Sequence, residues 1–305
     1  MKLAFWGSGP ISDFHVPALR AAGFEIEVAF SRENSDRLKI FCEKHGLSAS
    51  QNQTDFLDYC SSSDAIFVAL KSEVVYASLK DIVKLGKPIL AEKPGAVDRD
   101  GLRRLRELGS PSIYWAYNRR FYISATELKG FANKTIAVNI VWPETKRSNH
   151  QFVINGCHIV DLIHFSYGKF KILSRRSLGE NRGFSAHLLT DHGLPITLSV
   201  PFGASANAEI NAYLEDGKVL HVKPLEDLYL QSGLRIIEPD QGSRIRQYIP
   251  EIQEYKSDRN SLLKPGFQDQ AEAFLNLVKG SGKGHLASHS EGLLSLELTL
   301  DLLET

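Results

Sequence analysis

Over the first 117 residues, short apolar runs that are typical of buried strands alternate with segments of helical apolar spacing. The strand-like runs cover residues 2–6, 25–31, 64–70, 88–91 and 112–116. Between them, apolar positions recur at helical spacing until a glycine, such as Gly23, Gly46 or Gly86, ends the helix. Strands that alternate with helices indicate a doubly wound parallel sheet with right-handed crossovers. The pattern therefore predicts an N-terminal α/β domain of the Rossmann type over residues 1–117.

The pattern changes after residue 117. Strand-like runs joined by turn signals follow, namely KTIAVNIVW, FSAHLLTD, PITLSVPF, AEINAYLED and KVLHVKP. They predict an α+β domain over residues 118–305 with a large, mainly antiparallel open sheet. One helix interrupts it at NGCHIVDLIHFSYG, and the tail returns to helical periodicity, so we expect the C-terminal helix to pack back on the N-terminal domain. The most polar stretch, about residues 240–262, is expected to be a loop.

Composition narrows the classes of function. Lys plus Arg and Asp plus Glu both number 36, and this balance argues against a nucleic-acid-binding body and a polybasic membrane anchor. The three cysteines are widely spaced without a CxxC pair, so we expect no disulfide framework and no metal site. The start lacks a signal-peptide pattern and no apolar run approaches about 20 residues. We expect a cytoplasmic protein.

The turn GSGPIS lies directly after the first strand and before the first helix. Glycines there let a dinucleotide pyrophosphate approach the backbone at a helix N-terminus, and Ser12 is small enough to replace the third glycine of the fingerprint. An ordinary turn is the alternative, which the flanking strand and helix disfavour. The residues of the turn that we expect to bind the cofactor are Gly7, Ser8, Gly9, Pro10 and Ile11.

The end of the second strand indicates which dinucleotide binds. An acidic residue usually binds the adenosine 2′-hydroxyl there, whereas this chain has Ser31 and Arg32. A guanidinium suits a 2′-phosphate, so NADP(H) is favoured and NAD(H) is possible. An exposed arginine in a loop is the alternative interpretation of Arg32.

Five motifs occur in one order over residues 1–168: GSGPIS, SREN, AEKPGA, AYNRRF and NGCHIVDLIHF. Together they resemble the glucose-fructose oxidoreductase, inositol dehydrogenase and rhizopine catabolism family (Gfo/Idh/MocA). The resemblance implies an NAD(P)-dependent oxidoreductase of sugars, sugar nucleotides or cyclitols. It also implies a sugar-like small-molecule substrate and a homodimer or homotetramer formed through the sheet of the second domain.

The resemblance also assigns roles near the third and fourth strands. Lys93 matches the family's active-site lysine, whose ammonium would stabilise alkoxide charge while hydride leaves carbon. Glu92 would hydrogen-bond near the cofactor ribose, with a structural ion pair as the alternative. Leu70 and Lys71 replace the family's Thr-Pro-Asn and are expected to line the cofactor site.

His158 matches the family's catalytic histidine, and an ordinary pKa of about 6.5 suits a group that exchanges a proton near neutrality. Asp161 shares its helix face and could orient the imidazole or bind substrate. Many relatives carry an acid or amide where this chain has Ile154, and Asn155 is the nearest polar residue, a candidate for substrate binding. Cys157 is interpreted as a packing residue rather than a nucleophile. Lys93 and His158 are expected to converge over the nicotinamide.

The AYNRRF motif lies at the expected domain junction, where Tyr117 and either Arg120 or Arg119 could contact the substrate. A buried arginine that ties the domains together is the alternative.

Four histidines have no partner at regular spacing and are expected to be surface or packing residues: His15, His45, His187 and His192.

Two other functions remain open at this stage. A non-catalytic protein that senses a dinucleotide or sugar would keep the fold, and the loss of a polar residue at Ile154 favours it. An enzyme that reduces an imine or a linear tetrapyrrole is a third possibility, but those branches of the family generally alter the Glu-Lys-Pro that is intact here.

Overall fold

The computed structural model describes residues 1–32, 35–109, 111–240, 242, 244–255 and 263–304. By its internal contacts the chain divides into two compact units. Unit 1 comprises Met1–Phe121 and Asn260–Asp301, and unit 2 comprises Tyr122–Arg259 and Leu302–Thr305. Within the described ranges, every helix is too short or too polar to cross a membrane.

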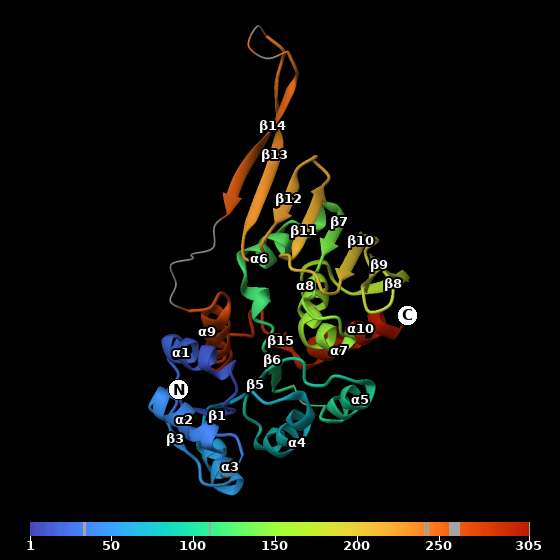
Figure 1. Ribbon diagram of the computed structural model, residues 1–305. Coiled ribbons are helices and arrows are strands. Elements are labelled where there is room, and N and C mark those ends of the chain that lie inside the picture. Colours follow the sequence, from blue (N-terminus) through green and yellow to red (C-terminus); the bar gives the residue numbers. More distant parts are fainter. Residues whose placement is uncertain (33–34, 110, 241, 243, 256–262, 305) are drawn as a thin grey trace. The chain divides into compact units, whose positions relative to one another are not determined.

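Unit 1 is built on a seven-stranded sheet (Figure 1). Its strands are β1 (Leu3–Trp6), β2 (Val28–Phe30), β3 (Ser48–Ala49), β4 (Ala65–Val68), β5 (Ile89–Ala91), β6 (Ile113–Trp115) and β15 (Ala287–Ser288). The order is β15-β6-β5-β4-β1-β2-β3, and every pairing is parallel except that of β15 with β6. The doubly wound parallel sheet predicted from the sequence is confirmed.

The helices of unit 1 are α1 (Ser12–Ala22), α2 (Asp36–His45), α3 (Gln53–Ser62), α4 (Ser72–Ile82), α5 (Arg99–Glu107), α9 (Phe267–Val278) and α10 (His289–Glu304), whose residues from Leu302 on belong to unit 2. There are also 3-10 turns at Val83–Leu85 and Asn118–Phe121. Gly23 and Gly46 end α1 and α2 in the left-handed conformation, and Gly86 ends the turn after α4. The pair β3 and α3 has no counterpart in the sequence analysis; β3 has only two residues and therefore leaves no strand pattern.

The core of unit 1 is aromatic where β1 meets β4. The rings of Phe5 and Phe67 stack at 5.0 Å, and both side chains are fully buried. The tail helix α9 packs on α1, where the ring centres of Phe14 and Phe267 are 6.0 Å apart, and Phe274 of α9 lies 5.6 Å from Phe24, which follows α1. The C-terminal tail therefore completes the core that surrounds the glycine turn.

Unit 2 contains an eight-stranded sheet in the order β14-β13-β12-β11-β7-β10-β9-β8. Its strands are β7 (Thr135–Val141), β8 (Phe170–Ser177), β9 (Gly183–Thr190), β10 (Pro195–Pro201), β11 (Glu209–Leu214), β12 (Val219–Val222), β13 (Leu228–Ile237) and β14 (Gln247–Tyr255). All pairings are antiparallel except β7 with β10. The mainly antiparallel sheet is confirmed, whereas the expectation of a loop at 247–255 is wrong. No residue of β14 is fully buried, so its sequence lacks the alternation that reveals a strand.

The helices of unit 2 are α6 (Ile123–Gly130), α7 (Asn149–Gln151) and α8 (Cys157–Tyr167), with a 3-10 turn at Ala132–Lys134. A π-turn at Phe152–Gly156 joins α7 to α8. Gly156 is needed there, because a Cβ would lie 2.2 Å from the Phe152 ring. Every residue of α8 except His164 is buried, and Phe152 meets Phe184 of β9 edge-on at 5.1 Å. The segment before His158 is therefore packed on the sheet.

The buried Arg120 of unit 1 generates a prediction about acid stability. Its side chain is 1% exposed and lies 3.3 Å from the Glu291 carboxylate, which is 29% exposed. Burial raises the pKa of Glu291, but hydrogen bonds from Lys283 and Ser288 and the charge of Arg120 outweigh it and bring the pKa to about 2. A carboxyl with a lowered pKa stabilises the fold above its unfolded value of 4.5, and this is lost as pH falls toward 2.

We therefore expect Glu291→Gln to remove part of the dependence of stability on pH. Between pH 6 and pH 3 the wild type should lose roughly 1–2 kcal/mol more free energy of unfolding than the variant, after allowance for the partial exposure of the carboxyl. Urea unfolding at both pH values measures this. Glu297→Gln on the same helix, which breaks a surface ion pair with Arg106, is the control. Equal losses in wild type and Glu291→Gln would contradict the assignment.

Candidate functional site: a dinucleotide cavity and two buried acid networks

The glycine turn after β1 passes very close to the end of β4. Gly7 has φ +139°, and a Cβ there would lie 2.3 Å from the carbonyl oxygen of Ala69. The Gly7 N–H donates to Phe30 O at 2.7 Å, and the Ala69 N–H donates to Trp6 O at 2.7 Å. Only glycine fits this position, so the turn is held against the carboxyl ends of three neighbouring strands.

A cavity of about 750 Å³ opens at this edge of the sheet, entirely within unit 1. Six of the predicted cofactor residues line it: Ser8, Gly9, Ser31, Arg32, Leu70 and Lys71. Five others are not among its lining residues: Gly7, Pro10, Ile11, Glu92 and Lys93. At Gly9, the position of a Cβ has no described atom within 4 Å, so the backbone there is open to a ligand. Carboxyl ends of parallel strands are where open α/β sheets bind their ligands.

The charges around the cavity favour an anion. Three cationic side chains line it, Arg32, Arg37 and Lys71, against the single carboxylate of Asp81. Arg37 was not predicted from the sequence. Its Nε donates to Ser8 O at 2.7 Å, which fixes the guanidinium beside the glycine turn. A pyrophosphate or a phosphomonoester fits a donor set of this kind.

Local structure explains why Arg37 reaches the cavity. Ser35, which also lines the cavity, caps α2 by accepting a hydrogen bond from the Leu38 N–H at 3.3 Å. The first turn of the helix then carries Arg37 beside the glycine turn. The sequence signal for Arg37 is an arginine in the first turn of the helix that follows the second strand, whereas the cofactor prediction rested on the residues at the end of that strand.

Lys93 follows β5 in a loop that is fixed by a buried pair of a histidine and a carboxylate. His15 Nε2 lies 2.6 Å from Glu92 Oε1, with the side chains 2% and 11% exposed. The other carboxylate oxygen accepts the Lys93 N–H at 3.2 Å, and Ser72 donates to Pro94 O at 2.8 Å. The Lys93–Pro94 bond is cis. This geometry favours the structural interpretation of Glu92. His15 is a packing residue, as expected, because its buried ring lies 4.3 Å from that of Phe67, and its pairing with Glu92 was not predicted.

The AYNRRF segment is buried in unit 1. Tyr117 is 2% exposed and Arg120 is 1% exposed, and Arg120 pairs with Glu291. The Asn118 amide donates to Pro265 O at 3.3 Å, which joins the segment to the chain just before α9. This favours a structural role for Arg120, and the substrate contacts predicted for Tyr117 and Arg120 stay predictions.

In unit 2, α8 carries the predicted His158 and Asp161 on one face. Both are buried, at 6% and 1% exposure. Cys157 is a fully buried free thiol whose Sγ donates to Ile154 O at 3.3 Å, as expected of a packing residue. The helix thus holds a histidine and a carboxylate three residues apart inside the protein.

A second buried carboxylate lies in the same unit. Glu144 is 1% exposed and accepts hydrogen bonds from Trp142 Nε1 at 2.8 Å and from Asn155 Nδ2 at 3.1 Å. Asn155 therefore faces Glu144 from the π-turn that precedes His158. Sequence reasoning missed Glu144, because it lies in an irregular segment after β7 and only the fold brings it beside Asn155.

Among the residues that the structure describes, no three His, Cys, Asp or Glu side chains come together in a way that could hold a metal ion.

The burial of Cys42 and Cys60 raises the pKa of their thiols to about 11 and about 12, so both are unreactive at neutral pH.

The chain is similar to known oxidoreductases. Residues 1–109 match the model of the oxidoreductase family with an NAD-binding Rossmann fold, GFO_IDH_MocA. No curated protein matches the chain.

Three solved structures share the fold over the whole chain. A dehydrogenase (MviM) from Clostridium difficile is 18% identical with a TM-score of 0.77, covering 100% of this chain and 99% of its own. A putative NADPH-dependent oxidoreductase from Desulfitobacterium hafniense is 14% identical with a TM-score of 0.79 (100% and 94%). UDP-N-acetylglucosamine 3-dehydrogenase from Acidithiobacillus ferrooxidans is 15% identical with a TM-score of 0.73 (99% and 96%).

At such identities the solved structures establish the fold, and the family model establishes the dinucleotide-binding part. The resemblance seen in the sequence motifs is thus confirmed over residues 1–109, which match the model of the Gfo/Idh/MocA oxidoreductase family.

Proposed function

We propose that the protein is an NAD(P)-dependent oxidoreductase that transfers a hydride between nicotinamide and a hydroxyl or keto carbon of a sugar or sugar nucleotide. The observation that carries the proposal is the cavity of unit 1, where the open Gly9 backbone and three cationic side chains meet at the carboxyl ends of the strands. Residues of this cavity would hold the dinucleotide, which supplies or accepts the hydride. Related structures with NADPH-dependent and sugar-nucleotide activities in their names support the class.

Each predicted catalytic residue has a distinct role in the proposal. The Lys93 ammonium stabilises charge on the substrate oxygen and orients the hydroxyl. The imidazole of His158 takes the hydroxyl proton during oxidation and returns it during reduction. Asp161 on the same helix face orients the substrate or the imidazole. His15 and Glu92 hold the loop that carries Lys93 and are positioning residues.

A direct assay tests the proposal. Purified protein is mixed with NADP⁺ or NAD⁺ and a panel of sugars, cyclitols and sugar nucleotides, and absorbance at 340 nm is followed. Turnover of at least one substrate is expected. Cofactor binding without turnover of any substrate would support the second candidate, a dinucleotide- or sugar-sensing protein, which Ile154 favours by replacing a polar residue near His158.

We also propose a homodimer or homotetramer formed through the sheet of unit 2. The face of that sheet opposite its buried rows carries exposed apolar side chains, including Tyr213 at 38% and Val141 at 40%. Antiparallel sheets leave one face to water or to a partner, and exposed apolar residues favour a partner.

Cofactor preference is the first prediction of this function. Arg32 and Arg37 both line the cavity, so NADPH should bind more tightly than NADH by about 1–3 kcal/mol, the range for charge-assisted contacts with a phosphate. Arg32→Ala and Arg37→Ala should each reduce that difference, and the double variant should abolish it. Dissociation constants from nicotinamide fluorescence at one ionic strength provide the measurement.

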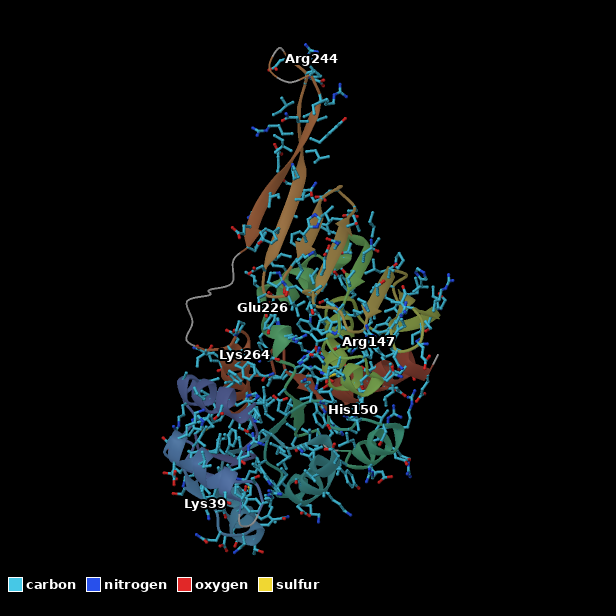
Figure 2. All side chains as sticks on the ribbon, in the orientation of Figure 1. Lys39, Arg147, His150, Glu226, Arg244 and Lys264 are labelled. Atoms are coloured by element: carbon cyan, nitrogen blue, oxygen red, sulfur yellow. The ribbon has the colours of Figure 1, made fainter. Side chains whose placement is uncertain are left out.

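The matched control is Lys39→Ala. It removes one positive charge from the same helix as Arg37 at a position outside the cavity lining. The Lys39 side chain, labelled in Figure 2, is 66% exposed. Lys39→Ala should leave the preference unchanged. Equal affinities of the wild type for NADPH and NADH would refute the assignment.

The second prediction concerns Lys93. Lys93→Met should lower kcat by about 10²-fold or more, as loss of a charged contact to the transition state does. Affinity for the dinucleotide should stay nearly unchanged, because Lys93 does not line the cavity. Lys87→Met, the same substitution just before β5 rather than just after it, is the control. A variant of Lys93 with wild-type kcat would remove this residue from the mechanism.

The third prediction concerns His158. His158→Ala should lower kcat by about 10²- to 10⁴-fold, the usual scale for a general acid or base, and flatten the pH profile of oxidation near neutrality. His164→Ala on the same helix provides the control. Steady-state kinetics from pH 5 to 9 measures both effects. Strong activity with an unchanged pH profile in His158→Ala would place the proton transfer elsewhere, with Asp161 and Tyr117 the next residues to test.

A further inference from the structure

Unit 2 contains a cavity of its own, of about 660 Å³, at the C-terminal end of α8. Ser166, Tyr167 and Gly168 line it where the helix ends, and because a helix rises 1.5 Å per residue, about 12 Å of helix separates Ser166 from His158. The other lining residues come from the end of α6, which packs against α8, from the turn after α6, from the start of β7 and from the turn between β9 and β10 (Figure 1). The cavity shares no lining residue with the cofactor cavity of unit 1.

Hydrogen bonds hold the walls of this second cavity in place. Thr190 Oγ1 accepts the Leu194 N–H at 3.0 Å, which fixes the turn between β9 and β10. Thr135 Oγ1 donates to a backbone carbonyl of the preceding turn at 2.9 Å, which fixes the start of β7. Gly168 ends α8 with φ +84°, and the His192 ring lies 3.8 Å from the position that a Cβ would take there. The cavity is thus preformed, as sites for small molecules usually are.

The buried lining residues form the floor of the cavity, and four of them carry hydroxyl groups. Thr135, Ser166, Tyr167 and Thr190 are at most 9% exposed. Burial raises the pKa of Tyr167, so its hydroxyl stays protonated at neutral pH and can donate. The buried Ser166 hydroxyl has no hydrogen-bond partner among the described residues. Such a hydroxyl lowers stability, and a serine changes rotamer without moving the backbone, so a molecule in the cavity is a suitable partner.

The end of α8 decides which part of a ligand suits the floor. The last backbone carbonyl groups of a helix lack partners within the helix, and this end carries a partial negative charge. An anionic group is therefore unfavourable beside Ser166 and Tyr167. Hydroxyl groups of a ligand are favourable there, because they donate to carbonyl oxygens and both donate to and accept from side-chain hydroxyls.

The exposed lining residues form the rim, which favours the opposite charge. Lys129 is exposed, and its ammonium lies 4.0 Å from the centre of the Phe165 ring. His192 and Asn133 are exposed lining residues that add further N–H donors. Among the described residues that line the cavity, none is a carboxylate; Asp191, next to His192 in the chain, is not one of them. A phosphate or another anionic group therefore suits the rim.

We propose that this cavity is a binding site for a polyhydroxylated anion of the sugar phosphate class, with the hydroxyl groups of the ligand at the floor and the phosphate at the rim near Lys129 and His192. A volume of about 660 Å³ lies in the range of sites for small molecules. The inference does not depend on the proposed oxidoreductase activity, because neither Lys93 nor His158 lines the cavity.

Calorimetric titration of the full chain with glucose 6-phosphate tests the site. Saturating NADPH keeps the probe from the cofactor cavity, where Arg32 and Arg37 would attract its phosphate. Glucose 6-phosphate should bind at least ~10-fold more tightly than inorganic phosphate or glucose, because it alone engages both the rim and the floor. Absence of binding at about 10 mM, where even a weak site is occupied, would mean that the cavity holds water only and would overturn the proposal.

Two variants locate the bound probe. Lys129→Met should weaken binding of glucose 6-phosphate at least ~10-fold, and Ser166→Ala about 5-fold or more, the usual scales for a charged and a neutral hydrogen bond. Lys134→Met is the matched control, because Lys134 is exposed, follows α6 in the same turn and does not line the cavity. It should bind the probe as the wild type does. Wild-type affinity in both Lys129→Met and Ser166→Ala would place the probe elsewhere and refute the site.

Thermal unfolding separates binding from a structural role of the Ser166 hydroxyl. Without the probe, Ser166→Ala should have the Tm of the wild type or a higher one, because the buried hydroxyl has no partner to lose. Glucose 6-phosphate should then raise the Tm of the wild type more than that of the variant. A variant that is less stable without the probe and gains the same increase with it would show a structural role alone, against the proposal.

Discussion

The close approach of the Gly7 backbone to Ala69 is the constraint on which the dinucleotide site depends. With no side chain at position 7, the turn after β1 is drawn against the end of β4, and hydrogen bonds to Phe30 and from Ala69 tie it to both neighbouring strands. The position of the turn at the edge of the sheet is therefore fixed by its neighbours. Ser8 and Gly9 then face the cavity, and the Ser8 carbonyl is available to hold the Arg37 guanidinium at 2.7 Å.

The loop that carries Lys93 also depends on the close approach of a glycine to its neighbours. Gly95 lies against the Trp115 ring, where a Cβ would be 2.1 Å from the nearest ring atom. On the other side of the loop, the His15–Glu92 pair links α1 to the end of β5. The same helix thus begins at the glycine turn and contributes the histidine that fixes the Glu-Lys-Pro loop. Two regions far apart in the sequence are held by one short helix, so the position of Lys93 follows from that of the turn.

Unit 2 stabilises its histidine helix in another way. The π-turn at Phe152–Gly156 lets Phe152 pack over a glycine and directs Asn155 to the buried carboxylate of Glu144. A buried carboxylate is tolerated because N–H groups from Trp142 and Asn155 satisfy it. The predicted continuous helix from residue 155 is thereby interrupted, and the interruption lies two residues before His158. Such π-turns frequently occur at functional sites.

The sequence by itself determined the alternation of strands and helices in unit 1, the glycine turn, most strands of unit 2 and the motifs that carry the resemblance to the oxidoreductase family. These features depend on the local spacing of apolar residues and on glycines whose backbone conformation is required by the local turn. Tertiary structure alone decided the partners of side chains far apart in the chain: His15 with Glu92, Asn155 with Glu144, Arg37 with Ser8, and Arg120 with Glu291. It also revealed β14 as a strand, because a ribbon that buries neither face needs no apolar alternation and leaves no periodic signal.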